Sequence, residues 1–282
     1  MTDHEVLEDD FTYVIRKAFK GLALSPSEAA VRAGLAEGEV LAFSRGEFSA
    51  AIAQQLAPVL GLNPQALARH ARYLPEPLAQ EGIARLDLPF EHERVNAWLI
   101  HYGETVILFD TGYNPGSCAA ALASITPEFI FITHHHVDHI GGIPDFLVRG
   151  VIPHGPSIAD ATPMQPGATL VAGALTIRAC DLSGHAMPAL GYFIEGFPQP
   201  ILVTGDALFA GSMGGCTTPQ VYQHALAQLR EILAPLPDAT ILLPGHGPAT
   251  TLGEERVSNP FLSSNWQHGE DLEAAEDTKR PM

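Results

Sequence analysis

The sequence predicts a mixed α/β protein in which a small all-helical domain precedes a larger domain of strands and helices. Short helical patterns broken by Gly and Pro fill residues 11–73, and three strand-like runs follow one another between residues 83 and 109. Strand and helix patterns then alternate towards residue 262. A linker rich in proline, Tyr73-Leu74-Pro75-Glu76-Pro77, separates the parts. We therefore expect domains at residues 11–73 and 74–262.

Composition narrows the class of protein. The 282 residues carry a net charge of −17, and residues 74–282 contain 8 Lys or Arg against 23 Asp or Glu. So acidic a surface repels phosphate backbones, which argues against nucleic-acid binding by the larger domain. Three cysteines are too few and too scattered for a disulfide framework, and they favour a reducing, cytoplasmic setting. The chain shows neither a secretory signal nor an apolar run long enough to span a membrane.

The ends of the chain are polar. Residues 1–10 carry five acids and no Lys or Arg, and residues 263–282 are polar and acidic as well. Segments of this kind cannot bury enough apolar surface to offset the entropy of ordering. We expect two disordered acidic tails that flank the two domains.

Five short helices are expected in residues 11–73. Ser25-Pro26-Ser27-Glu28 reads as an N-cap, a first-turn proline and a capping-box acid, so a helix begins there and runs to Ala33. The other helical patterns cover residues 14–21, 37–43, 50–60 and 64–72. With Gly34 at the tight turn, this arrangement resembles the Cro/repressor-type helix-turn-helix domain.

The third of these helices departs from a DNA-reading helix. It presents Glu37 and Glu39 where DNA-binding members of that family carry polar or basic side chains, and carboxylates repel phosphates. The expected role is therefore protein contact, either in a homodimer formed through this domain or in packing on the larger domain. DNA binding stays open as an alternative.

The larger domain begins with strands at residues 83–88, 95–100 and 105–109, which read as a β-meander. Helices are expected at residues 117–124, beyond Gly142, and at 222–233, where apolar residues recur with helical spacing.

A dense group of candidate metal ligands follows the apolar run at residues 129–132. His134, His136, Asp138 and His139 lie within six residues, directly after this expected strand. Side chains alternate on a strand, so His134 and His136 point to one side and His135 to the other. Imidazole and carboxylate together suit zinc, iron or manganese.

Three further candidates follow later strands. His185, Asp206 and His246 each come directly after a glycine that closes a strand-like run. Glycine allows the backbone to approach a crowded site closely. We expect these three side chains to join the earlier group.

The motifs from Asp110-Thr111-Gly112 to His246 resemble the metallo-β-lactamase superfamily. Within it, Thr133-His134-His135-His136, the segment at 205–211 and the segment at 244–250 are most similar to the glyoxalase II (hydroxyacylglutathione hydrolase) branch. The resemblance covers roughly residues 78–262. It implies an αββα sandwich and a metal-dependent hydrolase.

The resemblance also implies a ligand set. His134, His136 and His185 would hold one divalent ion, Asp138, His139 and His246 a second, and Asp206 would bridge them. Zinc is the expected metal, with iron and manganese as alternatives. Asp138 and Asp110 are the residues assigned to catalysis, Asp110 because it would accept a hydrogen bond from a ligand histidine and fix its tautomer. Two such ions lower the pKa of a shared water and so generate a hydroxide nucleophile.

The implied substrate is a small molecule with a thioester or ester carbonyl. Glyoxalase II chains carry a basic residue shortly after the Gly205-Asp206 motif, whereas this chain reads Gly214-Gly215-Cys216-Thr217-Thr218 there. A thioester, ester or lactone of modest charge is therefore expected. Two alternatives stay open: a mononuclear iron persulfide dioxygenase, and a ligand sensor in which the metal domain regulates a DNA-binding helix-turn-helix.

Overall fold

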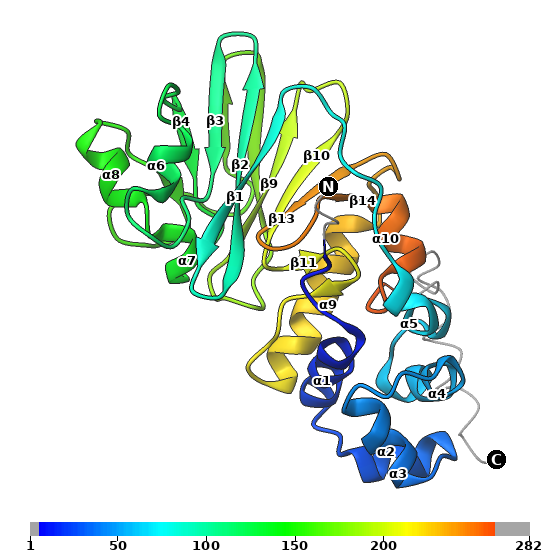
Figure 1. Cartoon of the computed structure of the whole chain (residues 1–282). Helices are drawn as coiled ribbons and strands as arrows, with labels where there is room; N and C mark the ends of the chain where they lie inside the picture. The colour runs from blue at the N-terminus through cyan, green and yellow to red at the C-terminus, as the bar shows by residue number, and fades with distance from the viewer. Residues whose placement is uncertain (1–5, 263–282) are drawn as a thin grey trace, which may run out of the picture.

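The computed structural model describes residues 6–262, and within them two six-stranded β-sheets pack face to face (Figure 1). The first sheet has the order β1 (Ile83–Phe90), β2 (Glu93–Tyr102), β3 (Thr105–Phe109), β4 (Phe129–Phe131), β5 (His154–Gly155) and β6 (Thr162–Pro163). The second has the order β14 (Thr250–Thr251), β13 (Ile241–Pro244), β10 (Ile201–Gly205), β9 (Leu190–Glu195), β8 (Leu175–Asp181) and β7 (Thr169–Ala172). With helices on both outer faces, the sandwich expected from the family resemblance is confirmed.

Strand β2 shows why the first sheet is buried on both faces. Alternate residues of a strand point to opposite sides of its sheet. Trp98 and Ile100 face the second sheet, whereas Ala97 and Leu99 face the core beneath the outer helices. The antiparallel pairing of β2 with β1 and β3 is the β-meander that the sequence predicted.

Helices cover the outer faces of both sheets (Figure 1). On the side of the first sheet lie α6 (Ser117–Ala121), α7 (Val137–Ile140) and α8 (Ile143–Val148). On the side of the second sheet lie α9 (Pro219–Leu233), α10 (Leu252–Ser258) and a small hairpin of β11 (Leu208–Phe209) and β12 (Ser212–Met213). Helix α6 is shorter than the predicted helix at 117–124. Helix α9 begins three residues before the predicted start, because Thr218 caps its first turn.

Several strands deliver their carboxyl ends to one edge of the sandwich. Strands β3, β4 and β5 are parallel neighbours in the first sheet, and β10 and β13 are parallel neighbours in the second. The residues that follow β3, β4, β10 and β13 therefore meet at the same edge.

The N-terminal helices lie where the sequence placed them, and they form a group beside α9 and α10 (Figure 1). They are α1 (Phe11–Leu22), α2 (Pro26–Ala33), α3 (Glu37–Ser44), α4 (Ala50–Leu56) and α5 (Pro64–Arg69). Two 3-10 turns, Ala57–Leu60 and His70–Arg72, extend α4 and α5 over the rest of their predicted lengths. The capping box at Ser25 and Glu28 is formed, and Gly34 ends α2 in the left-handed conformation.

The helical domain shares a hydrophobic core with the larger domain. Residues of α1 to α5 belong to the same buried cluster as residues of α9, α10 and the second sheet. At Gly21 in α1, a Cβ would come within 2.3 Å of the Tyr222 ring. The backbone of α1 therefore packs directly against the Tyr222 side chain of α9. Further along, the backbone N–H of Asn63 donates to the carbonyl of Pro260 at 2.7 Å. The helices are therefore packed on the larger domain over a wide area.

The start of the chain differs from the expected acidic tail. Asp10 caps α1 by accepting hydrogen bonds from the backbone N–H groups of Thr12 and Tyr13. Asp9 is only 4% exposed and forms an ion pair with Lys17. Pairing and capping offset the cost of ordering these acids, so Asp9 and Asp10 are held at the start of α1. Residues 1–5 and the predicted tail at 263–282 lie outside the described residues.

Within residues 6–262, none of the helices combines the length and the apolarity that crossing a membrane requires.

Candidate metal centre

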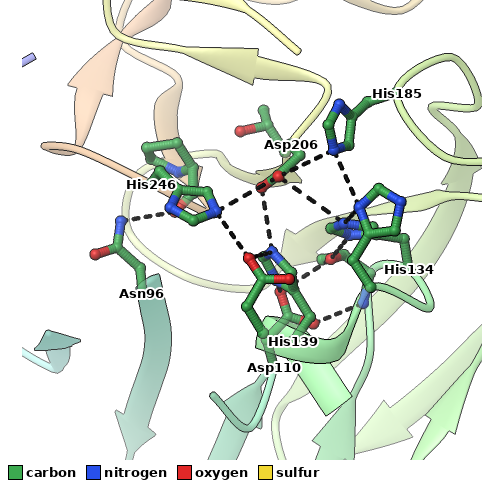
Figure 2. A network of polar contacts seen from close by, with 12 residues as sticks. Asn96, Asp110, His134, His139, His185, Asp206 and His246 are labelled. Carbon is green, nitrogen blue, oxygen red and sulfur yellow. Dashed lines mark hydrogen bonds and ion pairs between the residues drawn. The ribbon is translucent and has the colours of Figure 1, made fainter. Parts of the chain in front are cut away.

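All seven predicted ligands meet at the sandwich edge where the strands end. Figure 2 labels His134, His139, His185, Asp206 and His246 among them. His134 and His136 follow β4, Asp138 and His139 lie in α7, and His185, Asp206 and His246 follow β8, β10 and β13. Ligand-type atoms in each of two groups lie within 4.8 Å of one another. The first group is His134, His136, His185 and Asp206, and the second is Asp138, His139 and His246.

In the first group, three imidazole nitrogens face one another. Nδ1 of His136 lies 3.1 Å from Nε2 of His134 and 3.1 Å from Nε2 of His185. Oδ2 of Asp206 lies 3.4 Å from the same His185 nitrogen. The rings come from different segments, so tertiary folding brings them together.

The outer nitrogens of these rings fix the tautomers. His185 Nδ1 lies 3.0 Å from the carbonyl of Gly215, which can only accept, so Nδ1 carries the proton. The Thr133 hydroxyl donates to Asp110 at 2.9 Å, and it therefore accepts from His134 Nδ1 at 3.0 Å. The inner Nε2 atoms of both rings thus present lone pairs. Facing lone pairs repel unless a cation lies between them.

The second group has the same arrangement. His139 Nδ1 donates to Asp110 at 2.8 Å, and His246 Nδ1 donates to the carbonyl of Arg94 at 2.7 Å. Their Nε2 atoms lie 3.5 and 3.2 Å from Oδ2 of Asp138. Four histidines therefore have an acceptor on the outside and a lone pair on the inside, which is the usual preparation of a histidine for metal binding.

Asp206 belongs to both groups. Its Oδ2 lies 3.4 Å from His185 Nε2 and 3.5 Å from His246 Nε2, while Oδ1 lies 3.3 Å from His139 Nε2. Within the described part of the chain, His139 Nε2 and Asp206 Oδ1 are buried without a hydrogen-bond partner. Orphaned buried polar atoms are costly, so this pair needs a charged species to satisfy it.

The carboxylates make the cluster attract positive charge. Burial opposes protonation of His139 and His246, but Asp206 and its neighbouring carboxylates outweigh burial and raise the pKa of His139 to about 10 and of His246 to about 11. Burial and the neighbouring histidines instead lower the pKa of His134 and His136. His134 and His136 therefore stay neutral, whereas His139 and His246 attract a cation at their inner nitrogens, either a proton or a metal ion.

Two glycines give Asp206 its space. A Cβ on Gly245 would lie 2.1 Å from Asp206 Oδ1, and a Cβ on Gly214 would lie 2.0 Å from the Asp206 carbonyl. A side chain at Gly245 would displace the shared carboxylate, and one at Gly214 would displace the backbone that carries it.

Asp110 lies behind the cluster. It is 3% exposed, and it accepts hydrogen bonds from His139, from the Thr133 hydroxyl and from the Thr133 backbone N–H. Its φ of 61° places it in the left-handed region, which aims the carboxylate back into the fold. Asp110 thus orients a histidine, whereas Asp138, the other acid predicted to act in catalysis, lines the open cavity.

A cavity of about 700 Å³ opens over the cluster. Its walls include His136, Asp138, His185, Asp206 and His246, with the exposed His135 at the rim. The sequence did not predict the rest of the lining, which comes from Glu8, Asp9, Tyr13, Lys17, Phe90, Glu93, Val137, Phe209 and Gly215. Four of these residues precede residue 18. No local pattern near them signals a site, because only the packing of α1 on the larger domain brings them there.

Lys17 lies beside the uncharged segment that follows Asp206. Its ammonium pairs with Asp9, donates to the carbonyl of Met213 at 2.8 Å and lies 5.3 Å from the centre of the Phe209 ring. Its Cε lies 3.8 Å from the position of a Cβ on Gly215. A cation is thus present at this wall, supplied by the helical domain.

The sequence profile of the metallo-β-lactamase superfamily matches residues 91–177. The chain is 30% identical over 164 residues to the hydroxyacylglutathione hydrolase GloC of Haemophilus influenzae, covering 49% of this chain and 76% of that protein. It is 33% identical over 161 residues to a hydroxyacylglutathione hydrolase of Nitrosomonas eutropha, covering 53% of this chain and 59% of that relative. Among solved structures, TTHA1623 in a di-iron-bound form matches with a TM-score of 0.51 and 25% identity, over 63% of this chain and 100% of that one.

Proposed function

This chain belongs to the metallo-β-lactamase superfamily, and from that membership and the geometry of its site we propose that it is a dinuclear, glyoxalase II-like hydrolase of thioester or ester carbonyls. The observation that carries the proposal is the set of inward lone pairs. Nε2 atoms of His134, His139, His185 and His246 point at one another and at Asp206, each with its outer nitrogen committed to an acceptor.

The residues fit divalent ions. The donors are imidazole nitrogens and carboxylate oxygens with no thiolate, a set that suits zinc, iron and manganese. Two ions bound here would lower the pKa of a water to near neutrality and polarise the substrate carbonyl. We propose zinc as the metal. The di-iron-bound form of TTHA1623 supports iron as the alternative.

The chain's own residues prepare this chemistry. Asp206 Oδ1 lies near His139 of the second group, and Oδ2 lies near both His185 of the first group and His246 of the second, so this carboxylate could hold both positions and offset the repulsion between two cations. Asp110 keeps the His139 proton on Nδ1. Asp138 lines the cavity beside His246, where it can orient the attacking water. The burial of the cluster strengthens each of these interactions.

A complete second group favours two ions over one. Asp138, His139 and His246 gather on their own side of Asp206, with the Asp138 carboxylate 3.2 Å from His246 Nε2. A mononuclear dioxygenase site needs only three protein ligands, and this geometry provides seven.

The substrate proposal rests on the relatives. Two of them are named as hydroxyacylglutathione hydrolases, so we propose that the reacting group here is likewise an acyl thioester, with esters as close alternatives. The cavity of about 700 Å³ is large enough for a small molecule of this class.

Metal analysis of the purified protein, combined with a panel of thioesters and esters, tests the proposal. We expect two ions per chain and turnover of acyl thioesters, both lost in Asp206→Asn. His224→Ala serves as the matched control, because His224 is exposed on α9 and does not line the cavity. One iron per chain with oxygen uptake on a persulfide would replace the proposal with the dioxygenase. Full hydrolysis by metal-free protein would refute it.

A further inference from the structure

Resting on the proposed hydrolase function, we infer that the N-terminal segment and α1 form the substrate-selecting wall of the cavity, and that this wall favours an uncharged or cationic pendant group over an anionic one. The pendant group is the part of the substrate that does not react. The wall consists of Glu8, Asp9, Tyr13 and Lys17.

The wall is held in place by contacts with the larger domain. Glu8 Oε2 lies 4.0 Å from His246 Nδ1, and the Glu8 backbone nitrogen would lie 3.2 Å from a Cβ on Gly247. Lys17 binds the Met213 carbonyl in β12, and the start of the chain runs past β11 in Figure 1. Both contacts tie the helical domain to loops that follow metal-ligand segments. The wall therefore borders the cavity that contains the cluster.

The charge of the cavity mouth is negative. Outside the metal cluster, Glu8, Asp9 and Glu93 line it, and Lys17 is the only Lys or Arg among the described lining residues. Lys17 is already engaged, since it pairs with Asp9 and donates to Met213. This pair is neutral as a unit, which leaves the Glu8 and Glu93 carboxylates to set the sign of the wall, whereas bound metal ions would set the charge at the cluster itself. An anionic group held here would lie within a Debye length of both, about 10 Å at 0.1 M salt, and would be repelled.

The apolar part of the lining suits a cation equally well. Phe90, Tyr13 and Phe209 contribute aromatic rings to the same cavity. Aromatic faces attract ammonium groups, and one such contact already exists between Lys17 and Phe209. Carboxylates interleaved with aromatic rings accommodate an ammonium or an uncharged chain, whereas a carboxylate finds no unpaired Lys or Arg among the described lining residues.

Asp9 controls the only cation at this wall. Its side chain is 6% exposed and holds the Lys17 ammonium. Asp9→Asn keeps an oxygen acceptor of the same shape for Lys17 but removes the neutralising charge. The ammonium would then be available to an anionic pendant group, so the preference should shift towards anions.

The experiment compares three acetyl thioesters with the metal-loaded full chain: acetylthiocholine, the acetyl thioester of mercaptopropionate, and an uncharged alkyl thioacetate. We expect kcat/KM for the cationic thioester to exceed that for the anionic one by roughly tenfold or more at low salt, shrinking as salt is added. The double variant Glu8→Gln with Glu93→Gln should reduce the ratio several-fold, and Asp9→Asn should reduce it too by raising activity on the anion. Glu104→Gln, an exposed acid of the β2–β3 turn, is the matched control.

Binding provides a second readout. Calorimetry with two methyl ketones, which carry a trimethylammonium or a carboxylate on the same three-carbon chain, should give the same order of affinity without turnover. If all three thioesters are hydrolysed with equal kcat/KM, or the anion is preferred, the selectivity inference is refuted while the hydrolase proposal stands. If none is hydrolysed and neither ketone binds, both are refuted.

Discussion

The shared role of Asp206 can be tested with a single added methyl group. In Gly245→Ala the new Cβ would lie 2.1 Å from Asp206 Oδ1 and 2.7 Å from His139 Cε1, whereas real Cβ contacts essentially never fall below 3.0 Å. The Gly245 backbone lies outside the left-handed region, so alanine fits its conformation. Its backbone hydrogen bonds to Gly205 and Asn96 do not involve the Cβ. The perturbation therefore falls on the Asp206 carboxylate and the His139 ring rather than on the strand.

The size of the displacement sets the expected loss. Moving Oδ1 from 2.1 to 3.0 Å requires a shift of about 0.9 Å, several times the tolerance of about 0.2 Å that metal–ligand distances allow. Loss of an orienting partner alone costs 10–100-fold in metal affinity, so displacing a ligand should cost about 100-fold or more. At about 1.4 kcal/mol per tenfold, that is about 2.8 kcal/mol of binding free energy. Because Asp206 faces both groups, both ions should be affected.

The assay is metal content after gel filtration in the presence of a weak chelator, together with thermal unfolding with and without added metal. Gly245→Ala should lose both ions and the metal-dependent part of its Tm, while its circular dichroism stays close to that of the wild type. Gly38→Ala is the control, since no atom lies within 4 Å of that Cβ and alanine favours a helix. A Gly245→Ala protein that keeps both ions at wild-type affinity would show that Asp206 is not a shared ligand.

Three further predictions follow from single features. Asp110→Asn should lower metal affinity and kcat/KM roughly 10–100-fold without unfolding the protein, because the His139 tautomer is no longer fixed; an unchanged metal titration would contradict this. Burial lowers the pKa of His70 in the folded state. Below about pH 6.5 the unfolded chain therefore binds a proton at His70 that the folded chain does not bind. The free energy of unfolding should then fall by up to about 1.4 kcal/mol per pH unit as the pH drops. Urea unfolding of wild type and His70→Gln between about pH 7.5 and 5.5 checks this, the variant showing the shallower slope. Because Glu37 and Glu39 are exposed on α3, no sequence-specific gel shift should appear on genomic fragments even at low salt, and retention of one fragment would reopen the DNA-binding alternative.

The helices and strands could be predicted because local signals agree with the tertiary structure, whereas the αββα layering was implied by the family resemblance. Ser25 and Glu28 form a capping box in sequence and in space, and the apolar run at 95–100 is a central strand buried on both faces. The candidate ligands could also be found in the sequence, because each of them follows an apolar strand and parallel strands end at a common edge. In both cases the information lies within about ten residues of the feature.

Other parts of the site have no such local signal. Lys17 and Glu8 lie in an amphipathic helix and an acidic segment that look like an ordinary surface, and their place in the cavity depends on the packing of Gly21 against Tyr222. The acidic start of the chain read as a tail for the same reason. The burial of Asp9 is offset by its ion pair with Lys17, and this pair depends on the folded position of α1. Sequence patterns report on periodicity and turn chemistry, not on which distant surfaces meet.

The interface between the two domains therefore links stability to selectivity. Detaching helix α1 from the larger domain would expose the core around Tyr222. When α1 is packed in place, Lys17 lies beside β12 and the metal cluster. A substitution that loosened this packing, such as a side chain at Gly21, would therefore change the cavity mouth before it touched a metal ligand. Metal content would stay near two ions while the charge preference among thioesters disappeared. That separation of effects is what a selecting wall predicts, and an inert helical appendage would not produce it.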